Sequence, residues 1–393
     1  MQKELRLLTR IFNSCKINMK ALQISTPFLP VTPDLKYGGS ERVLYLLDSE
    51  LTNLGYSAGV VAPEGSNPAS KLYPTIPRAI GVDDVLDKAK NSAFTGFALR
   101  ADHAARAIKY ANELEGIDLV HLHDDNILPF DFLINKPSLV TLHSDIDSFW
   151  DLSITPFVGK RKSKFVSISQ SQKKIYESKG HKVDYVVYNG VDENVFSISD
   201  KKHPYLLSLG GINPVKGQKD AIEVGKRTGL DVILAGNIGN AGYFETEIKP
   251  HITHDLTKES DKLGAYLSFP SASPKVVYVG PVTDTQKAPL YSNATAFLMP
   301  IHWEEPFGLV LVESMLSGTP VIAYNRGSIP EIVKDGTGII VPAENLEEMV
   351  RSVNQVGSLN PEECRRIAAQ EFGKSRMAHN YLAVYEDILN QKN

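Results

Sequence analysis

The sequence is poor in cysteine, and its two cysteines, Cys15 and Cys364, stand far apart with no spacing typical of a disulfide framework or a zinc site. This scarcity favours a reducing compartment, and we expect a cytoplasmic protein. No apolar run approaches the roughly 20 residues of a membrane-spanning helix, and no secretory signal pattern is present. The net charge of -4 gives no reason to expect nucleic acid as a partner.

What the sequence does contain is the composition of a soluble globular enzyme, with 42% hydrophobic and 22% charged residues. A chain of 393 residues suggests about two domains, each large enough for its own core. Residues 1–18 differ from the rest, and MKALQIST from Met19 resembles a first buried strand. We expect residues 1–18 to be a tail or a misassigned start, with an amphipathic membrane anchor as the less favoured alternative.

Short apolar runs alternate with helical patterns along the whole chain, which predicts parallel sheets covered by helices on both faces. The predicted strands are Ala21–Thr26, Gly59–Ala62, Leu119–His123, Leu139–His143, Phe165–Ser169, Tyr185–Tyr188, Tyr205–Gly210, Asp231–Ala235, Val276–Val279, Ala296–Met299, Val321–Tyr324 and Gly338–Val341. We expect an α/β protein of two Rossmann-like domains, 19–196 and 205–373, with a linker at 197–204 and a last helix in 374–393 that crosses back to the first domain. Ligands of such sheets bind beyond the carboxyl ends of the strands, so the cleft should lie between the domains. Part of the polar segment Tyr243–Pro274 is interpreted as a surface insertion.

The most informative stretch is Trp303–Gly318, WEEPFGLVLVESMLSG, which is apolar nearly all round from Phe307 to Leu316 except at Glu313. A carboxylate in a dry helix is costly unless it is paired or hydrogen-bonded. The hydroxyl groups of a ligand would satisfy Glu313, and so would a basic neighbour in an ordinary core. The stretch by itself leaves both alternatives open.

Turn residues at both ends predict that this helix begins just after Glu305 and ends near Ser317. The free N–H groups of residues 307–309 would then form an anion site. Glu305 and Glu313 would lie roughly 12 Å apart along the axis, at about 1.5 Å per residue. A carboxylate, an anion site and a second carboxylate match a sugar ring, a diphosphate and a ribose, which indicates a sugar nucleotide.

Three further motifs fall in predicted loops or at strand ends. Gly38 and Gly39 precede a helix and can approach a phosphate or the acceptor closely, although such glycines often mean only a tight turn. Lys216, in LGGINPVKG, is placed to neutralise a diphosphate leaving group, the alternative being a solvated lysine. His143, at the carboxyl end of a predicted strand, could bond a sugar hydroxyl or could be a satisfied half-buried histidine.

Support for metal or membrane binding is weaker. His121 and His123 share a strand face, but no third ligand has suitable spacing. Asp145-Ile146-Asp147 is like the Asp-x-Asp clamp of metal-dependent sugar transferases, yet that clamp belongs to a one-sheet architecture. Basic residues between 160 and 174 are interpreted as a solvated face rather than a docking surface for an anionic membrane. We expect neither a metal nor a cofactor.

Taken together, these stretches resemble the retaining sugar-nucleotide transferases of glycosyltransferase family 4, which have the GT-B fold. The resemblance runs from Met19 to Pro342 and rests on motifs in characteristic order, namely YGGSERV, DLVHLHDD, LVTLHSD, FVSISQSQ, VVYNGVDENVF, LGGINPVKG, VILAGN, VVYVGPV, WEEPFGLVLVESMLSGTPVIA and GSIPEIVKDGTGIIV. FVSISQSQ and YNRGSIPEI are similar to the branch that includes tetrahydropterin glucosyltransferases and antibiotic sugar transferases.

The resemblance implies a role for each residue that matches a family motif. By this resemblance, Glu313 holds the ribose hydroxyls and Glu305 contacts the donor sugar. The backbone of Phe307, Gly308 and Leu309 surrounds the sugar and diphosphate. Lys216 binds the diphosphate, Gly39 gives the glycine-loop contact, and His143 lies near the sugar's hydroxymethyl group and anomeric centre. The resemblance also implies front-face attack with retention, in which the leaving phosphate helps to deprotonate the acceptor without a metal.

One departure from the family pattern concerns the loop before Lys216. Members usually have arginine where this chain has Gly211, and the loss of one diphosphate cation should weaken transition-state stabilisation by roughly 2–4 kcal/mol unless another replaces it. Arg326, in YNRGSIPE, is a candidate substitute.

We therefore expect a metal-independent hexosyltransferase whose donor is a nucleotide diphosphate sugar, with a UDP-sugar such as UDP-glucose as the first candidate. The acceptor would be a hydroxyl group of a small molecule, a glycan or a lipid-linked compound. The alternative is a sugar-nucleotide-binding protein with weak or no catalysis, suggested by Gly211. A dinucleotide oxidoreductase is disfavoured because no strand is followed by the G-x-G-x-x-G fingerprint. Acceptor contacts are expected from Pro63–Leu72 and Asp124–Phe130, which do not identify the acceptor.

Overall fold

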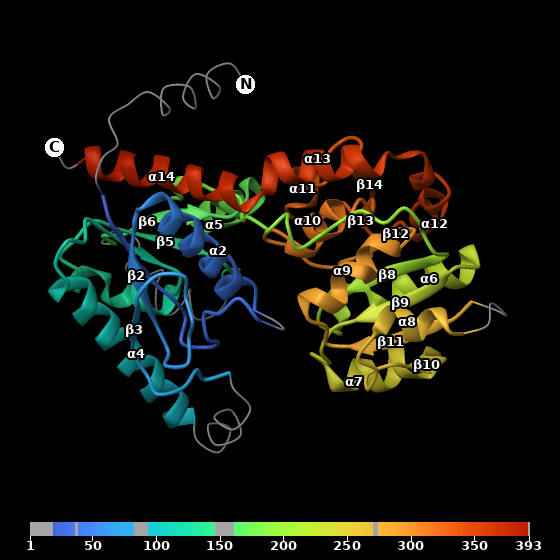
Figure 1. The fold of residues 1–393 in the computed structure, drawn as a ribbon, viewed down its shortest axis with the longest axis horizontal. Coiled ribbons are helices and arrows are strands. Elements are labelled where there is room, and N and C mark those ends of the chain that lie inside the picture. Colours follow the sequence, from blue (N-terminus) through green and yellow to red (C-terminus); the bar gives the residue numbers. More distant parts are fainter. Residues whose placement is uncertain are drawn as a thin grey trace.

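The computed structural model describes residues 19–35, 38–81, 93–144, 146, 161–269 and 274–391, which form two lobes (Figure 1). Each lobe contains a seven-stranded sheet whose neighbouring strands are all parallel. The expectations for residues 1–18, for Asp145 and Asp147 and for Lys160 lie outside the described residues.

The first sheet has the strand order β3-β2-β1-β4-β5-β6-β7. Its strands are β1 Ala21–Ile24, β2 Ser57–Ala62, β3 Leu72–Pro74, β4 Leu119–Leu122, β5 Ser138–Leu142, β6 Lys164–Ser167 and β7 Tyr185–Val186. The helices of this lobe are α2 Gly39–Leu54, α4 Ala93–Glu113, the 3-10 helix η1 Asp125–Leu133 and α5 Gln170–Ser178.

The second sheet has the order β10-β11-β9-β8-β12-β13-β14. Its strands are β8 Tyr205–Leu209, β9 Asp231–Ala235, β10 His254–Asp255, β11 Val276–Gly280, β12 Ala296–Met299, β13 Val321–Tyr324 and β14 Gly338–Val341. The helices that follow β7 in the chain are α6 Gln218–Thr228, α7 Ala241–Tyr243, α8 Lys262–Leu267, α9 Asp284–Asn293, α10 Leu309–Leu316, α11 Ile329–Ile332, α12 Leu346–Val353, α13 Pro361–Phe372 and α14 Lys374–Asn390, with 3-10 turns η4 Pro214–Lys216, η6 Lys249–His251 and η7 Val356–Ser358 and a π-helical turn η5 Phe244–Ile248.

The predicted fold class is confirmed, because every predicted strand is present and both sheets are parallel. Two edge strands, β3 and β10, were not predicted: β3 is only partly buried and ends in Pro74, and β10 is two polar residues long. A surface insertion was predicted for part of Tyr243–Pro274, and it is wrong for residues 243–256, which supply β10 at the sheet edge and bury Phe244 and Ile248 against the core. Residues 257–261 of the same segment are exposed.

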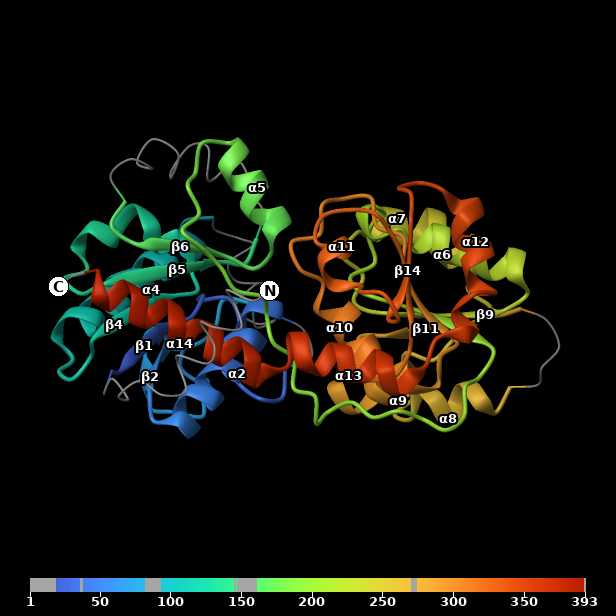
Figure 2. The ribbon, with the colours of Figure 1, turned by 90° about the horizontal axis from the view of Figure 1, so that it is seen from above.

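The last two helices run along one side of the molecule, α13 over the second lobe and α14 over the first (Figures 1 and 2). Met377, Tyr381 and Tyr385 of α14 are buried in a cluster with residues of α2 and the first sheet. Tyr385 also bonds Nδ1 of His121 at 2.7 Å, and the Tyr381 hydroxyl lies 2.8 Å from Thr141 Oγ1. The end of the chain is thus packed on the N-terminal lobe.

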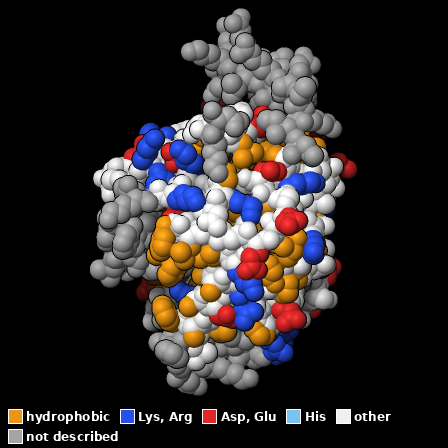
Figure 3. All heavy atoms as spheres, turned by 90° about the vertical axis from the view of Figure 1, so that its left-hand side faces the viewer, with side chains coloured by type: hydrophobic (Ala, Val, Ile, Leu, Met, Phe, Trp, Pro, Cys, Tyr) orange, Lys and Arg blue, Asp and Glu red, His pale blue; other side chains and the backbone are white. Residues whose placement is uncertain are grey.

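On the described part of the outer end of the N-terminal lobe, Lys and Arg side chains are interspersed with Asp and Glu side chains (Figure 3). Of the basic run, Arg161 pairs with Asp184 at 3.1 Å and Lys173 with Glu177 at 3.7 Å. Among the described residues, no helix combines the length and the apolar character needed to cross a membrane.

Candidate active site

The helix that carries Glu313 begins later than predicted. Gly308 is its N-cap and has a φ of 83°, in the left-handed region that favours glycine, so α10 starts at Leu309 and ends at Leu316. The prediction of a start just after Glu305 is therefore wrong, whereas the predicted end near Ser317 is confirmed. Since residues 305–308 are not helical, the straight-helix spacing expected between the two glutamates does not apply.

A cavity of about 440 Å³ lies between the lobes at the start of α10. From the N-terminal lobe it is lined by Gly39, Ser40, His143, Ser144, Ile168 and Asn189, and from the C-terminal side by Trp303, Glu305, Pro306, Phe307, Gly308 and Leu309. The cavity thus combines one carboxylate, one imidazole and the backbone around a left-handed glycine.

Side chains and backbone together fix Glu305. Its Oε2 accepts hydrogen bonds from Lys216 Nζ at 2.7 Å and from Trp303 Nε1 at 3.1 Å. The Lys216 ammonium group also lies 4.4 Å from the centroid of the Trp303 ring. Behind Glu305, Gly327 has a φ of 55°, and a Cβ there would lie 2.3 Å from the Glu305 backbone nitrogen. The close approach of these two loops holds the carboxylate and requires glycine at position 327.

A row of polar side chains leads to His143 from β1 and from the end of β4, the two strands that precede β5 in the sheet order. His143 Nε2 lies 2.9 Å from His123 Nδ1, and His123 Nε2 lies 3.0 Å from Gln23 Oε1. Because a carbonyl oxygen only accepts, His123 donates from Nε2, its Nδ1 accepts, and His143 donates from Nε2. Burial lowers the pKa of His143 to about 4, so the ring is neutral at pH 7. Nδ1 of His143, which has no partner within the described part of the chain, is then a hydrogen-bond acceptor.

A second cavity of about 230 Å³ contains Glu313. It shares Gly39 and Leu309 with the larger cavity. The residues that line it are Gly38, Gly39, Arg42, Leu209, Gly210, Gly211, Gly236, Asn237, Pro281, Val282, Lys287, Leu309, Val310 and Glu313. The two cavities therefore meet where the start of α2 faces the start of α10.

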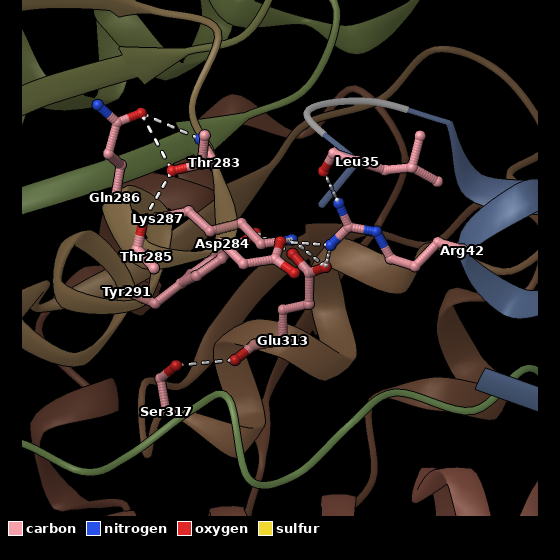
Figure 4. Close-up of polar contacts among 10 residues, drawn as sticks. All are labelled: Leu35, Arg42, Thr283, Asp284, Thr285, Gln286, Lys287, Tyr291, Glu313 and Ser317. Carbon is pink, nitrogen blue, oxygen red and sulfur yellow. Dashed lines mark hydrogen bonds and ion pairs between the residues drawn. The ribbon is translucent and has the colours of Figure 1, made fainter. Parts of the chain in front are cut away.

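Glu313 belongs to a cluster of charges that spans the lobes (Figure 4). Its Oε1 accepts a short hydrogen bond from Lys287 and lies 3.7 Å from Arg42 Nη1, while Oε2 accepts from the Tyr291 hydroxyl at 3.2 Å. Asp284 pairs with Arg42 and, at 2.9 Å, with Lys287. Burial opposes ionisation of Asp284, but the two cations outweigh it and hold the pKa of this carboxyl below its usual value. Glu313 thus has a basic neighbour and also lines a cavity.

The predicted site residues fall into two groups. Glu305, His143, Phe307, Gly308 and Leu309 meet in the larger cavity, beside Lys216; Glu313, Gly38, Gly39 and Gly211 line the smaller one. Arg326 lines neither cavity, and its guanidinium pairs with Glu304 at 3.3 Å and Glu344 at 2.9 Å. His121 bonds Tyr385 and Thr141 at 2.7 Å each, and no cluster of three or more potential metal ligands occurs among the described residues.

Sequence reasoning missed several residues of the site. Asn189 is buried, lines the larger cavity, and its Oδ1 has no hydrogen-bond partner among the described residues. Arg42 and Lys287 line the smaller cavity from different lobes. Arg42 lies within the YGGSERV motif, which offered a cue; Lys287 lies in a predicted helix with no local pattern that marks it.

Comparison with known families divides the chain into the same two parts as the fold. Residues 37–195 match the family described as Glycosyltransferase Family 4, and residues 192–372 match Glycosyl transferases group 1. The two matches meet at the connection between the lobes and together include every site residue named above except Gln23.

Curated relatives match over part of their length. An uncharacterized 41.2 kDa protein in the cps region of Klebsiella pneumoniae is 37% identical over 211 residues, which is 51% of this chain and 54% of that protein. A D-inositol 3-phosphate glycosyltransferase of Mycolicibacterium smegmatis is 26% identical over 207 residues, 49% of this chain and 44% of its own. The matched stretch spans about half the length of these relatives.

Solved structures agree over almost the whole chain. Sucrose-phosphate synthase from Thermosynechococcus elongatus has a TM-score of 0.70 at 16% identity, covering 95% of this chain and 100% of the other. Anabaena Alr3699/HepE in complex with UDP-glucose has a TM-score of 0.67 at 18% identity, with the same coverage. At such identities the likeness concerns the fold. The N-terminal lobe thus matches Glycosyltransferase Family 4, the C-terminal lobe matches Glycosyl transferases group 1, and the chain has the GT-B fold.

Proposed function

We propose that this protein is a retaining, metal-independent hexosyltransferase that uses a nucleotide diphosphate sugar. The observation that carries the proposal is the pair of cavities that join at Gly39 and Leu309, each with a carboxylate, Glu305 in one and Glu313 in the other. A ribose on Glu313 and a hexose on Glu305 would place the diphosphate at the junction. UDP-glucose is our first candidate, because one structural neighbour, Anabaena Alr3699/HepE, is a complex with UDP-glucose.

The residues around the larger cavity supply the contacts that transfer needs. Glu305 is held by Lys216 and Trp303, and its carboxylate can accept from hexose hydroxyls. Neutral His143 and the unpartnered Oδ1 of Asn189 add two further acceptors. Three residues with acceptor atoms line this cavity, which suits a polyhydroxyl ligand, whose hydroxyl groups can all donate.

In the proposed reaction the bond from the anomeric carbon to the diphosphate oxygen breaks and a bond to the acceptor oxygen forms on the same face. The acceptor proton passes to the leaving phosphate, which departs as the nucleoside diphosphate. Lys216 lies beside the cavity and stabilises the charge that develops on the phosphate. The acceptor would approach past Ser144, which lines the cavity and whose hydroxyl lies 3.5 Å from Asp125 in the predicted acceptor segment Asp124–Phe130.

A sugar-transfer assay with Glu305→Ala and Glu313→Ala tests the proposal, with Glu347→Ala, an exposed glutamate paired with Arg227, as the control. Glu305→Ala should chiefly slow transfer and Glu313→Ala should chiefly weaken nucleotide binding. A fully active Glu305→Ala protein would defeat the assignment. The alternative, a sugar-nucleotide-binding protein suggested by Gly211, predicts tight nucleotide binding without transfer to any acceptor. A cytoplasmic location and a place in the tetrahydropterin or antibiotic branch remain parts of this proposal.

A further inference from the structure

The smaller cavity contains two basic residues beside the position where a family arginine is replaced by glycine. Arg42 from α2 and Lys287 from α9 line it together with Gly211 and Glu313 (Figure 4). Arg326 lines neither this cavity nor the larger one. Among the described residues, Arg42 and Lys287 are thus the basic side chains that share a cavity with Gly211.

Both cations are held by two carboxylates, Glu313 and Asp284, and a bound ribose would engage Glu313. Lys287 Nζ bonds Glu313 Oε1 and Asp284 Oδ1, and Arg42 lies between the same two carboxylates. Two positive and two negative charges balance one another, as buried charges must. A ribose that donates to Glu313 has to compete with Lys287 for Oε1. When the ribose binds, Lys287 keeps Asp284 but loses its second partner.

A diphosphate is the chemical group that would take the released positive charge. In a nucleoside diphosphate the first phosphate is joined to the ribose, so it lies next to the ribose site by covalent geometry. The cavity that contains Lys287 and Arg42 shares Gly39 and Leu309 with the larger cavity, where the sugar would lie. The diphosphate must therefore pass the two cations.

We propose that Lys287 and Arg42 bind the donor diphosphate and replace the arginine that Gly211 lacks. Lys287 moves from Glu313 to the phosphate as the ribose takes Glu313. Arg42 belongs to the N-terminal lobe, so it contributes its charge only while the lobes are as close as they are in this structure. The inference rests on the proposed function, because it assigns the phosphate site of that same donor.

Calorimetric measurements of UDP and uridine binding to the full-length protein distinguish a diphosphate-binding role of Lys287 from a purely structural role. Lys287→Met should weaken UDP binding roughly 10- to 100-fold, the effect of a lost bond to a charged group. Uridine binding should stay unchanged or become tighter, because the competitor for Glu313 Oε1 is gone. A merely structural Lys287 would weaken both ligands alike. Lys219→Met, which removes an exposed lysine paired with Glu247, is the control. If Lys287→Met does not fold, Arg42→Gln gives the same comparison.

Rescue from position 211 is the second test. A Cβ on Gly211 would make only ordinary contacts, at 3.7 Å to Asn213 Nδ2 and Asn237 Oδ1, so a side chain can leave the backbone there without a clash. Gly211→Arg should restore at least part of the UDP affinity of Lys287→Met, and alone it should not raise turnover many-fold. Equal weakening of UDP and uridine without rescue overturns the inference. Failure of the unaltered protein to bind UDP, GDP or ADP defeats the proposed function instead.

Discussion

The hydrogen-bonded row Gln23–His123–His143, called the relay below, allows a substitution that should change activity more than stability. Gln23→Leu removes the oxygen to which His123 Nε2 donates at 3.0 Å. His123 is then free to place its proton on Nδ1 and donate to His143 Nε2. His143 in turn would carry its proton on Nδ1, the atom available to the cavity, and would change from an acceptor to a donor.

The cost in stability should be small. In the unaltered protein the buried Gln23 Nε2 has no partner among the described residues, and an unsatisfied buried donor lowers the free energy of unfolding by roughly 1–3 kcal/mol. Leucine removes this orphan donor at the same time as it removes the partner of His123. The two effects oppose each other, so the free energy of unfolding should change by less than about 1 kcal/mol.

The effect on catalysis should be larger than the effect on folding. Loss of one acceptor for a sugar hydroxyl corresponds to about 0.5–1.5 kcal/mol, or roughly 2- to 10-fold in kcat/KM. Nitrogen-15 spectra of the histidine rings report the tautomers directly, and urea unfolding reports stability. Ser138→Ala, which removes a buried hydroxyl of β5 that is bonded to Ser163, is the control. An unchanged His143 tautomer in Gln23→Leu would refute the relay.

Three further perturbations follow from the same structure. Gly327→Ala should lower kcat at least roughly 10-fold and destabilise the fold by about 1–3 kcal/mol, because its Cβ collides with the Glu305 backbone at a positive φ; unchanged kinetics would show that this contact is not needed. Glu331→Gln should raise KM for the donor with little change in kcat. The Glu331 carboxylate accepts across the lobes from the N–H groups of Gln170, at 2.7 Å, and Ser171 at the start of α5. An unaltered KM would mean that this contact does not hold the two lobes together. The free energy of unfolding should fall as the pH drops below about 6.5, by roughly 1.4 kcal/mol per pH unit for each buried histidine, because the unfolded chain binds protons that the folded chain does not. Burial lowers the pKa of His103 to about 4 and that of His121 and His123 well below the usual value, whereas Asp124, with its pKa raised to about 6, opposes the trend. Urea titrations at pH 7.5 and 5.5 that gave equal stability would contradict it.

The fold could be predicted because its information is local. Apolar runs buried on both faces of a parallel sheet are continuous in sequence, so all the long strands were found. The start of α10 was missed because Gly308 adopts a left-handed conformation that composition does not reveal. β10 was not predicted because its two polar residues show no hydrophobic pattern.

The candidate site could be predicted only where its residues stand in motifs. Glu305, Glu313 and Lys216 were predicted in this way, and the structure places the first two in cavities that share Gly39 and Leu309, while their roles stay predictions. The partners of Glu313 could not be found, since Arg42 and Lys287 come from helices far from it in sequence and meet it only in the tertiary structure.

The most direct test of the account is calorimetric binding of UDP, GDP and ADP to the purified protein without added metal. The account predicts micromolar binding of one of them, lost in Glu313→Ala and retained in Glu347→Ala. That result would support Glu313 as the ribose carboxylate and name the donor class. Binding of none of the three, or equal binding by Glu313→Ala, would contradict the claim that the joined cavities hold a nucleotide diphosphate sugar.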